Sequence, residues 1–550
     1  MPHPFKHSHP FVAATAGTWL ALPVSLWVLN VALSFHNQWP TPWVAIGHEL
    51  SLEVVLLVFA LGAWAEYRGA PSRLAQHWLA IALVLLCLGR YAEVTAPALY
   101  GRPINLYWDL PHLPAIATMF AQAAPAWATA AVIAAIAAMP VLLYGVLRGA
   151  LGGVWRALES AAPRRALLLL GATLVVLFAV TPRDQDAPFA VQFAQPVTQT
   201  YAQQASLLAD ALLGNPASEA LDRAAPLPHA DLARLAGADV LVVFLESYGA
   251  TVFDNARHRQ ALGAAQATLA GALARSGREA ASAFVVSPTF GGASWLAHAS
   301  LLAGHEVADP ATYAALLTSD RDTLVQRFAT RGYRAVALMP GLKRAWPEGS
   351  FYRFAHLYDA RQLDYRGPHF GWWAIPDQYS LAVLDTREFA SHPRAPLFAV
   401  FPTISSHMPF RPTPPYQSDW ERLLGERAFE PGALAASLAR APDWSDLSPA
   451  YTEAIAYALT TLAGYLARRP RREQVLLVLG DHQPPASVSG AQAGHEVPVH
   501  VIASRGELLR QFLHAGFAPG LTPARPALMP LHVLAPLLLQ AFSGEAATTR

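Results

Sequence analysis

The chain has 550 residues, of which 53% are hydrophobic and only 14% are charged, and its formal net charge is +1. So apolar a composition excludes an ordinary soluble protein of this length. The near-zero net charge gives no electrostatic footprint for nucleic acid. The single cysteine, Cys87, excludes a disulfide within the chain and leaves the redox compartment open.

Five apolar segments in residues 1–182 predict an N-terminal bundle of five transmembrane helices. They lie near residues 11–34, 44–64, 77–96, 127–147 and 166–180. A helix needs about 20 apolar residues to cross a bilayer, and the last segment is shorter than that. The first segment follows a polar start without a clear cleavage site, so we interpret it as a retained anchor rather than a removed signal peptide.

Basic residues in the connecting loops predict the orientation of this bundle. Lys6 precedes the first segment, Arg68 and Arg73 lie between the second and third, and Arg156 lies between the fourth and fifth. By the positive-inside rule the N-terminus is cytoplasmic. Five crossings then place the rest of the chain outside the cytoplasm. We therefore expect a multi-pass membrane protein with an extracytoplasmic domain.

Residues 183–237 predict a polar, Ala-rich connector that contains one amphipathic helix near residues 198–213. This helix suits the membrane surface or packing on the next domain. From residue 238 to about 545, short apolar runs alternate with helical patterns, which predicts an α/β domain whose parallel sheet is covered on both faces. The candidate strands are residues 240–245, 283–286, 335–338, 397–401, 475–479 and 497–502.

Chemically active side chains follow three of these strands. Glu246 follows the first strand, Ser294 begins a helix after a turn rich in Pro and Gly, and Asp481 and His482 follow the fifth. Ligands gather at the carboxyl ends of strands in an open α/β sheet, so these four side chains are expected to meet. Hard oxygens and one imidazole suit a divalent metal. The alternatives are helix caps for Ser294 and Glu246 and a simple turn at Asp481.

These stretches resemble the sulfatase-like branch of the alkaline phosphatase superfamily, whose membrane-bound members include lipoteichoic acid synthases and phosphoethanolamine transferases. Residues 245–249, LESYG, resemble the first metal-ligand motif of that branch, and residues 480–484, GDHQP, resemble its Asp-His motif. Ser294 precedes Gly304 by the ten residues that separate the nucleophile from Gly in sulfatases. The resemblance covers residues 238–542 and implies a sulfatase-type domain with a mixed, mostly parallel sheet.

The nucleophile stretch departs from the sulfatase pattern at two positions. Leu296 replaces its Pro and His298 replaces its Arg. Because that pattern directs oxidation to formylglycine, we expect no such oxidation here, and Ser294 would attack directly. The resemblance also implies one divalent metal, Mn²⁺ or Zn²⁺, held by Glu246, Ser294, Asp481 and His482, with a second metal as an open alternative.

Further residues are candidates for the substrate side of the site. His407 follows the fourth strand and would stabilise transferred charge or protonate a leaving group, unless it is only structural. The resemblance implies an aromatic and basic loop where Lys343, Arg344 and Trp346 stand, and cationic donors suit a phosphate. The remaining candidates are His298, one helical turn after Ser294, His495, which could serve a second metal, and Trp372, Trp373 and Asp377, which could line the same mouth or simply pack.

Together these features predict a membrane-anchored, metal-dependent transferase. A phospholipid would donate phosphoethanolamine or phosphoglycerol to Ser294, and an envelope glycan or lipid would accept it. The membrane anchor suits a lipid donor, which is the main argument for a transferase. The alternatives are a hydrolase of phosphate or sulfate esters from the same superfamily and an inactive binding protein in envelope assembly.

Overall fold

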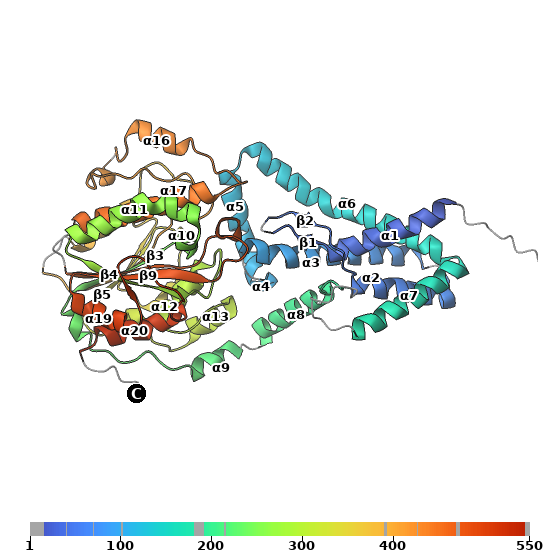
Figure 1. The fold of residues 1–550 in the computed structure, drawn as a ribbon, viewed down its shortest axis with the longest axis horizontal. Coiled ribbons are helices and arrows are strands. Elements are labelled where there is room, and N and C mark those ends of the chain that lie inside the picture. The colour runs from blue at the N-terminus through green and yellow to red at the C-terminus, as the bar shows by residue number, and fades with distance from the viewer. Residues whose placement is uncertain are drawn as a thin grey trace, which may run out of the picture. The chain divides into compact units, whose positions relative to one another are not determined.

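The computed structural model describes residues 16–39, 41–69, 71–100, 103–180, 192–213, 216–389, 393–425, 427–468 and 473–544. Figure 1 shows the elements formed by these residues. They divide into two compact units. The first unit draws on residues 1–98, 103–106 and 124–208, and the second on residues 99–102, 107–123 and 209–550.

The first unit is a helical bundle with a short two-stranded ribbon. Its elements are α1 (Ala16–Ser34), β1 (His36–Asn37), β2 (Val44–Ala45), α2 (Leu52–Arg68), α3 (Arg73–Tyr100), α6 (Ala126–Leu158), α7 (Ala161–Val180) and α8 (Val197–Leu213). Helix α1 packs on α6, and α2 packs on α7. Leu29, Leu83, Leu151 and Val154 belong to its buried core. Many large apolar side chains on the outside of α6 and α7 remain exposed, as expected for helices that face lipid.

The prediction of five transmembrane helices is wrong. Among the described residues, three helices are long and apolar enough to cross a membrane: Arg73–Leu99, Ala126–Leu158 and Ala161–Val180. Helix α2 has 17 residues, which extend over about 26 Å and fall short of the roughly 30 Å hydrocarbon core. The described apolar part of α1, Ala21–Ser34, is shorter still. Residues 11–15 of the first predicted segment, and Lys6, lie outside the described residues.

Helix α8 is tied to the bundle by polar contacts within the first unit. Tyr201 donates to Leu85 O at 2.6 Å, the Thr198 amide donates to Glu53 Oε1 at 3.1 Å, and Gln204 donates to Ile104 O at 2.7 Å. These bonds use the polar face of the amphipathic pattern. The three apolar helices form a membrane anchor by length and composition, and α8 is docked on that anchor.

The second unit is built on an eight-stranded mixed sheet. The strands are β3 (Asp239–Leu245), β4 (Glu279–Val286), β5 (Arg334–Met339), β6 (His356–Asp359), β7 (Leu397–Pro402), β8 (Gln474–Gly480), β9 (Glu496–Ala503) and β10 (Ala518–Pro519). Their order is β10-β4-β9-β8-β3-β7-β5-β6. Strands β8, β3, β7, β5 and β6 are parallel, whereas β9 runs antiparallel to both β8 and β4. The predicted mixed, mostly parallel sheet is confirmed, and all six predicted strands are present.

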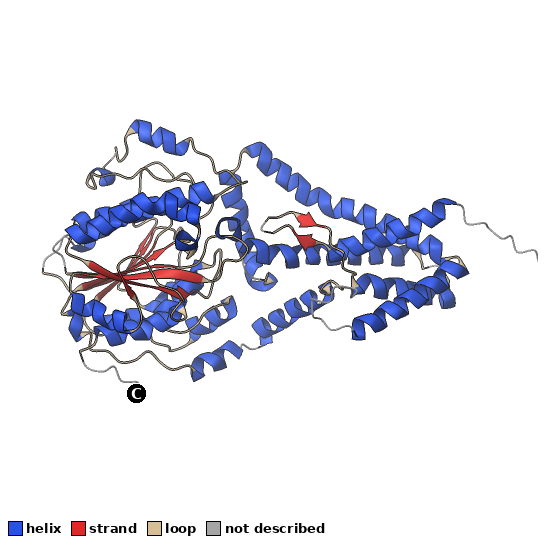
Figure 2. Cartoon of the chain, viewed as in Figure 1, coloured by secondary structure: helices blue, strands red, loops and turns tan. Residues whose placement is uncertain are grey.

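Helices cover both faces of this sheet (Figures 1 and 2). One face packs against α11 (Ala256–Arg275), α15 (Asp377–Leu384) and α17 (Ser448–Arg468). The other packs against α12 (Ser294–Ala303), α14 (Leu324–Ala329), α19 (Gly506–His514) and α20 (Leu534–Phe542). Alternate residues of β3 enter the two cores, with Leu241 and Val243 in one and Val242 and Phe244 in the other. Burial on both faces explains why the strand is continuously apolar.

Shorter helices complete the description. They are α4 (Leu106–Asp109), α5 (Leu113–Ala123), α9 (Pro216–Arg223), α10 (Thr251–Asp254), α13 (Pro310–Thr318), α16 (Pro431–Leu438) and α18 (Ala486–Ser489). Local sequence sets where helices begin. Asn255 accepts from the amides of Arg257 and His258 at the start of α11. Thr323 and Gln326 form a capping box that sets the start of α14 at Leu324.

A buried histidine within the sheet makes the stability of the second unit depend on pH. His500 on β9 is 3% exposed, with its Nδ1 2.6 Å from Ser282 Oγ and its Nε2 3.2 Å from the Tyr248 hydroxyl. Burial lowers the pKa of His500 to about 4. The unfolded chain, whose histidine has a pKa near 6.5, therefore takes up a proton first as the pH falls.

We expect the free energy of unfolding of the wild type to decrease by about 2 kcal/mol when the pH is lowered from 7 to 5, through this residue alone. In His500→Gln, which cannot titrate, this part of the loss should disappear. Denaturant unfolding of both proteins at the two pH values, followed by tryptophan fluorescence, measures the difference. An equal loss of stability in the wild type and the variant would contradict the assignment.

Candidate active site

Strand register brings the predicted metal-binding residues together. Strands β3 and β8 are parallel neighbours, and Leu245 pairs with Gly480. Glu246 and Asp481 are the next residues on each strand, so their side chains leave the same edge of the sheet together. Ser294, the first residue of α12, reaches this edge from β4: its Oγ lies 3.0 Å from Glu246 Oε2 and 3.1 Å from His482 Nε2.

The residues present fit a divalent cation. Donor atoms of Glu246, Asp481 and His482 all lie within 4.8 Å of one another, and all three residues are buried. His482 Nε2 is 3.4 Å from Glu246 Oε1 and 3.8 Å from Asp481 Oδ2. A tetrahedral site with ligands at about 2.0–2.1 Å has donor atoms about 3.4 Å apart, so these separations match.

Two further observations fit a cation at this position. Asp481 Oδ2 is buried and receives no hydrogen bond from a donor. His482 Nδ1 lies 2.7 Å from Gln483 O, an acceptor, so Nδ1 carries the proton and the lone pair of Nε2 faces the site. This outer contact is the usual way in which proteins orient a metal-binding imidazole.

The charges of the site are strongly coupled. Burial would raise the pKa of Glu246, but its hydrogen bond to His482 and the charge of that ring hold it well below its usual range. Burial, reinforced by the charge of Glu246, raises the pKa of Asp481 to about 7. Burial would lower the pKa of His482, but the two carboxylates raise it to about 9. In the metal-free site a second proton, on His482 Nε2, thus partly compensates the acidic pair, and a cation that replaced this proton would compensate the pair more fully.

The backbone before Ser294 is bent through three successive positive φ angles. They are 66° at Gly291, 152° at Gly292 and 60° at Ala293. Ala293 occupies the N-cap position of α12 and offers no capping side chain. The positive end of the helix dipole therefore acts on Ser294 and on any anion beside it. The Ser294 hydroxyl donates to Glu246 Oε2, which is the contact expected of a serine that is to lose its proton.

His298 lies on α12 beside a metal-binding carboxylate. Its Nε2 is buried without a hydrogen-bond partner and lies 3.8 Å from Asp481 Oδ2. Its ring packs against Phe244 with a centroid separation of 4.3 Å. Burial lowers the pKa of His298 to about 3, so the ring is neutral at physiological pH. The structure brings His298 to the metal ligands.

The loop that carries His407 is held by hydrogen bonds to the buried carboxylate of Asp377. Asp377, the first residue of α15, accepts from the amides of Ile404 and Ser405 at 2.8 and 3.1 Å. Burial raises the pKa of Asp377 to about 6. Asp377 therefore supports the loop, and it does not line the mouth as the sequence suggested. His407 follows this anchor, and its charge is one cause of the low pKa of Glu246.

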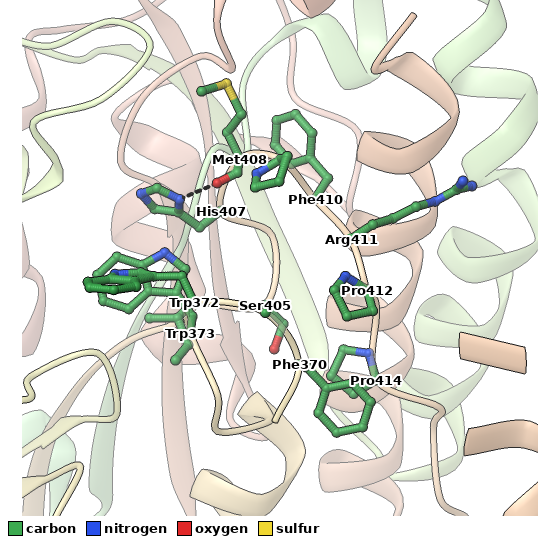
Figure 3. A pocket seen from close by; sticks show the side chains of 13 residues that line it. Phe370, Trp372, Trp373, Ser405, His407, Met408, Phe410, Arg411, Pro412 and Pro414 are labelled. Atoms are coloured by element: carbon green, nitrogen blue, oxygen red, sulfur yellow. Dashed lines mark hydrogen bonds between the residues drawn. The ribbon is translucent and has the colours of Figure 1, made fainter. Parts of the chain in front are cut away.

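Aromatic side chains form one wall beside His407 (Figure 3). The His407 ring lies 5.0 Å from that of Trp373, and the pocket between them and the 408–414 loop has a volume of only about 20 Å³. Such a volume holds about one water. Lys343 Nζ lies 3.9 Å from the centroid of the Trp372 ring and donates to Trp372 O. Lys343, from the loop predicted to be aromatic and basic, therefore packs with Trp372 and Trp373 rather than with Trp346.

The three other candidates differ in their surroundings. Arg344 is exposed. Trp346 stacks on Tyr352 with centroids 5.7 Å apart and packs on the core, which is a structural role. His495 is exposed beside Phe290, 5.5 Å away, and is not one of the clustered metal ligands.

Sequence reasoning missed the hydroxyl residues that fix Glu246. Thr403 Oγ1 accepts from the Glu246 amide at 3.0 Å, and Ser406 donates to Glu246 O at 2.7 Å. Ser247 donates to Glu246 Oε1 at 3.0 Å. The signal was the polar run just after β7, where Thr403 and Ser406 flank the predicted His407 loop.

Loss of both carboxylates should abolish metal binding. We expect purified protein equilibrated with Mn²⁺ or Zn²⁺ to retain about one ion per chain, and Glu246→Gln/Asp481→Asn to retain almost none, because two anionic ligands become neutral. Elemental analysis after gel filtration measures the content. The matched control, Glu306→Gln/Glu348→Gln, removes two exposed carboxylates from the same unit and should bind normally. Equal metal in both double variants would rule out this site.

Comparisons with known proteins add the following. No family model and no curated protein matches the chain. Among solved structures, the lipoteichoic acid synthase LtaP from Listeria monocytogenes is 14% identical over 48% of this chain and 65% of its own, just under two thirds of its length, with a TM-score of 0.32. A protein in the alkaline phosphatase superfamily from Vibrio parahaemolyticus is 15% identical over 52% and 68%, with a TM-score of 0.33.

The Streptococcus pyogenes phosphoglycerol transferase GacH, in complex with sn-glycerol-1-phosphate, is 9% identical over 60% of this chain and 79% of its own, with a TM-score of 0.35. All three TM-scores lie below 0.5, so function has to be inferred from the residues of this chain.

Proposed function

We propose that the chain is a membrane-anchored phosphotransferase. It moves phosphoethanolamine or phosphoglycerol from a phospholipid to a hydroxyl of an envelope glycan or lipid. One observation carries the proposal: the Ser294 hydroxyl, at a helix N-terminus, contacts both Glu246 and His482 of a buried metal-ligand cluster. An inactive binding protein would have no use for a nucleophile held against such a cluster.

The reaction has two displacements at phosphorus. Ser294 Oγ forms a bond to the phosphorus of the donor phosphodiester, and the bond from phosphorus to the diacylglycerol oxygen breaks. The serine hydroxyl, which contacts Glu246 Oε2 at 3.0 Å, loses its proton to solvent, and the diacylglycerol oxygen takes a proton from His407. The acceptor hydroxyl then attacks the same phosphorus and gives its proton to His407, while Ser294 Oγ leaves and regains a proton from solvent. A bound divalent cation would lower the pKa of the serine hydroxyl and offset phosphoryl charge.

The basic side chains of Lys343 and Arg344 would hold the phosphate of the donor. Lys343 keeps its ammonium group against Trp372, and exposed Arg344 follows it in the chain. The ordinary pKa of a lysine lies far above neutrality. Burial lowers the pKa of Lys343, but the side chain remains a cation at physiological pH. We propose that Lys343 and Arg344 contact the donor phosphate as it approaches Ser294.

The anchor favours a lipid substrate over a soluble ester. Three apolar helices keep the enzyme in the membrane that contains its donor. Three crossings and five crossings are both odd numbers, so the positive-inside argument still places the enzymatic domain outside the cytoplasm. We propose a periplasmic or extracytoplasmic site on the inner membrane.

Ser294 should carry the transferred group as a plain serine ester. We expect Ser294→Ala to lower diacylglycerol release from labelled phosphatidylethanolamine or phosphatidylglycerol by about 10³-fold or more, because the nucleophile is gone. Ser294→Thr, which keeps the hydroxyl, should retain part of the activity, and the exposed Ser350→Ala should retain all of it. Mass spectrometry of quenched wild type should show the headgroup phosphate on residue 294.

Three results would decide against this route. Full activity in Ser294→Ala would remove the nucleophile. An aldehyde mass at residue 294 would indicate formylglycine. Release of free headgroup phosphate at the same rate with and without acceptor would favour the hydrolase.

The proposed topology has a separate test. Arg68 and Arg156 should be cytoplasmic and the C-terminus extracytoplasmic. A C-terminal alkaline phosphatase fusion should then be active, while a fusion after Arg156 should be silent, because that reporter folds only outside the cytoplasm. The reverse pattern of activities would invert the orientation.

A further inference from the structure

Ser247 stands between the two metal-binding carboxylates in an unusual backbone conformation. It is 2% exposed, and its φ angle is +59°, in the left-handed region that favours glycine. All of its polar groups are engaged. The amide donates to Asp481 Oδ1 at 2.9 Å, the hydroxyl donates to Glu246 Oε1 at 3.0 Å, and the carbonyl accepts from Tyr451 at 2.9 Å.

These bonds divide the oxygens of each carboxylate into a held oxygen and a presented oxygen. Asp481 Oδ1 accepts from the amides of Ser247 and His482, which leaves Oδ2 buried without a donor. Glu246 Oε1 accepts from Ser247, which leaves Oε2 facing Ser294. A cation beside His482 and Ser294 would therefore meet Asp481 Oδ2 and Glu246 Oε2, while Glu246 Oε1, 3.4 Å from His482 Nε2, keeps its bond to Ser247. One residue sets the direction of both.

The left-handed backbone is what allows Ser247 to reach both partners. It turns the chain sharply after β3, so the amide meets the end of β8 while the side chain returns to Glu246. Glycine would adopt this turn without strain but would lack the hydroxyl. Alanine would keep the strained backbone and would also lack the hydroxyl. A serine here accepts a strained backbone and contributes a hydroxyl to a metal ligand, as expected where strain serves a site.

We propose that Ser247 is a positioning residue that fixes the orientation of Glu246 and Asp481 and so sets the affinity of the site for its cation. The inference rests on the proposed metal-dependent function and deepens it. Outer hydrogen bonds to metal ligands commonly change affinity by about 10- to 100-fold, and here one residue supplies such bonds to two ligands.

The test separates metal affinity from stability in the purified full chain. The dissociation constants for Mn²⁺ and Zn²⁺ are measured by competition with a chromogenic chelator, and the melting temperature is measured in excess chelator. Ser247→Gly should bind each metal about 10- to 100-fold more weakly. Its metal-free melting temperature should stay close to that of the wild type, because relief of the strained φ offsets the lost hydrogen bond. Ser247→Ala should bind as weakly as Ser247→Gly and melt lower, since its strain remains.

A matched control removes the same backbone strain elsewhere. Ala236 also has a left-handed φ, +47°, but is exposed before the opposite end of β3. Ala236→Gly should therefore leave metal affinity unchanged. Wild-type affinity in both Ser247 variants would overturn the inference, as would a loss of affinity that only follows a loss of metal-free stability. A wild type that binds neither metal would instead reject the proposed function itself, and this inference with it.

Discussion

The site depends on a single register between two parallel strands. Because Leu245 pairs with Gly480, the chain must place Glu246 and Asp481 side by side at the point where β3 and β8 end. Two carboxylates that close together in a buried place repel one another, and burial adds the cost of removing them from water. Everything around them counters that repulsion: the His482 ring, the amides of Ser247 and His482, and the Ser247 and Ser294 hydroxyls. The excess negative charge that destabilises the metal-free site also favours the binding of a divalent cation there.

The fold connects the three segments that carry Glu246, Ser294 and Asp481 by hydrogen bonds. The Ser287 hydroxyl bonds to Asp481 O, and the Gly291 amide bonds to Gln483 O. The loop before the nucleophile is thus fastened to the segment that carries the metal ligands. Strand β9 lies between β4 and β8, so this loop must pass across its end to bring Ser294 to His482. The three positive φ angles at Gly291, Gly292 and Ala293 allow that crossing.

Much of the enzymatic domain could be predicted because its signals are local. Continuous apolar runs identify buried parallel strands, and a carboxylate after a strand identifies the working edge, so the amino-acid pattern by itself groups Glu246, Asp481, His482 and Ser294. The edge strands β6 and β10, of four and two residues, were too short to stand out. The number of transmembrane helices was overestimated, because apolar composition alone does not show that α2 begins only at Leu52. Nor does sequence show that Ser247 has a left-handed backbone or that Asp377 points away from the mouth, since both follow from contacts between distant segments.

The division between this fastened centre and its surroundings has a consequence for how specificity could change. Lys343 follows β5, and Trp372 and Trp373 lie in the long segment between β6 and β7, so the wall that we propose meets the headgroup is carried by chain that supplies no candidate metal ligand. Under the proposed function, substitutions in that wall would alter which alcohol is attached to the transferred phosphate, while Ser294 and the candidate cation site stay as they are. A laboratory or a lineage could thus exchange headgroups by rebuilding one rim of the site, without having to refold the sheet beneath it.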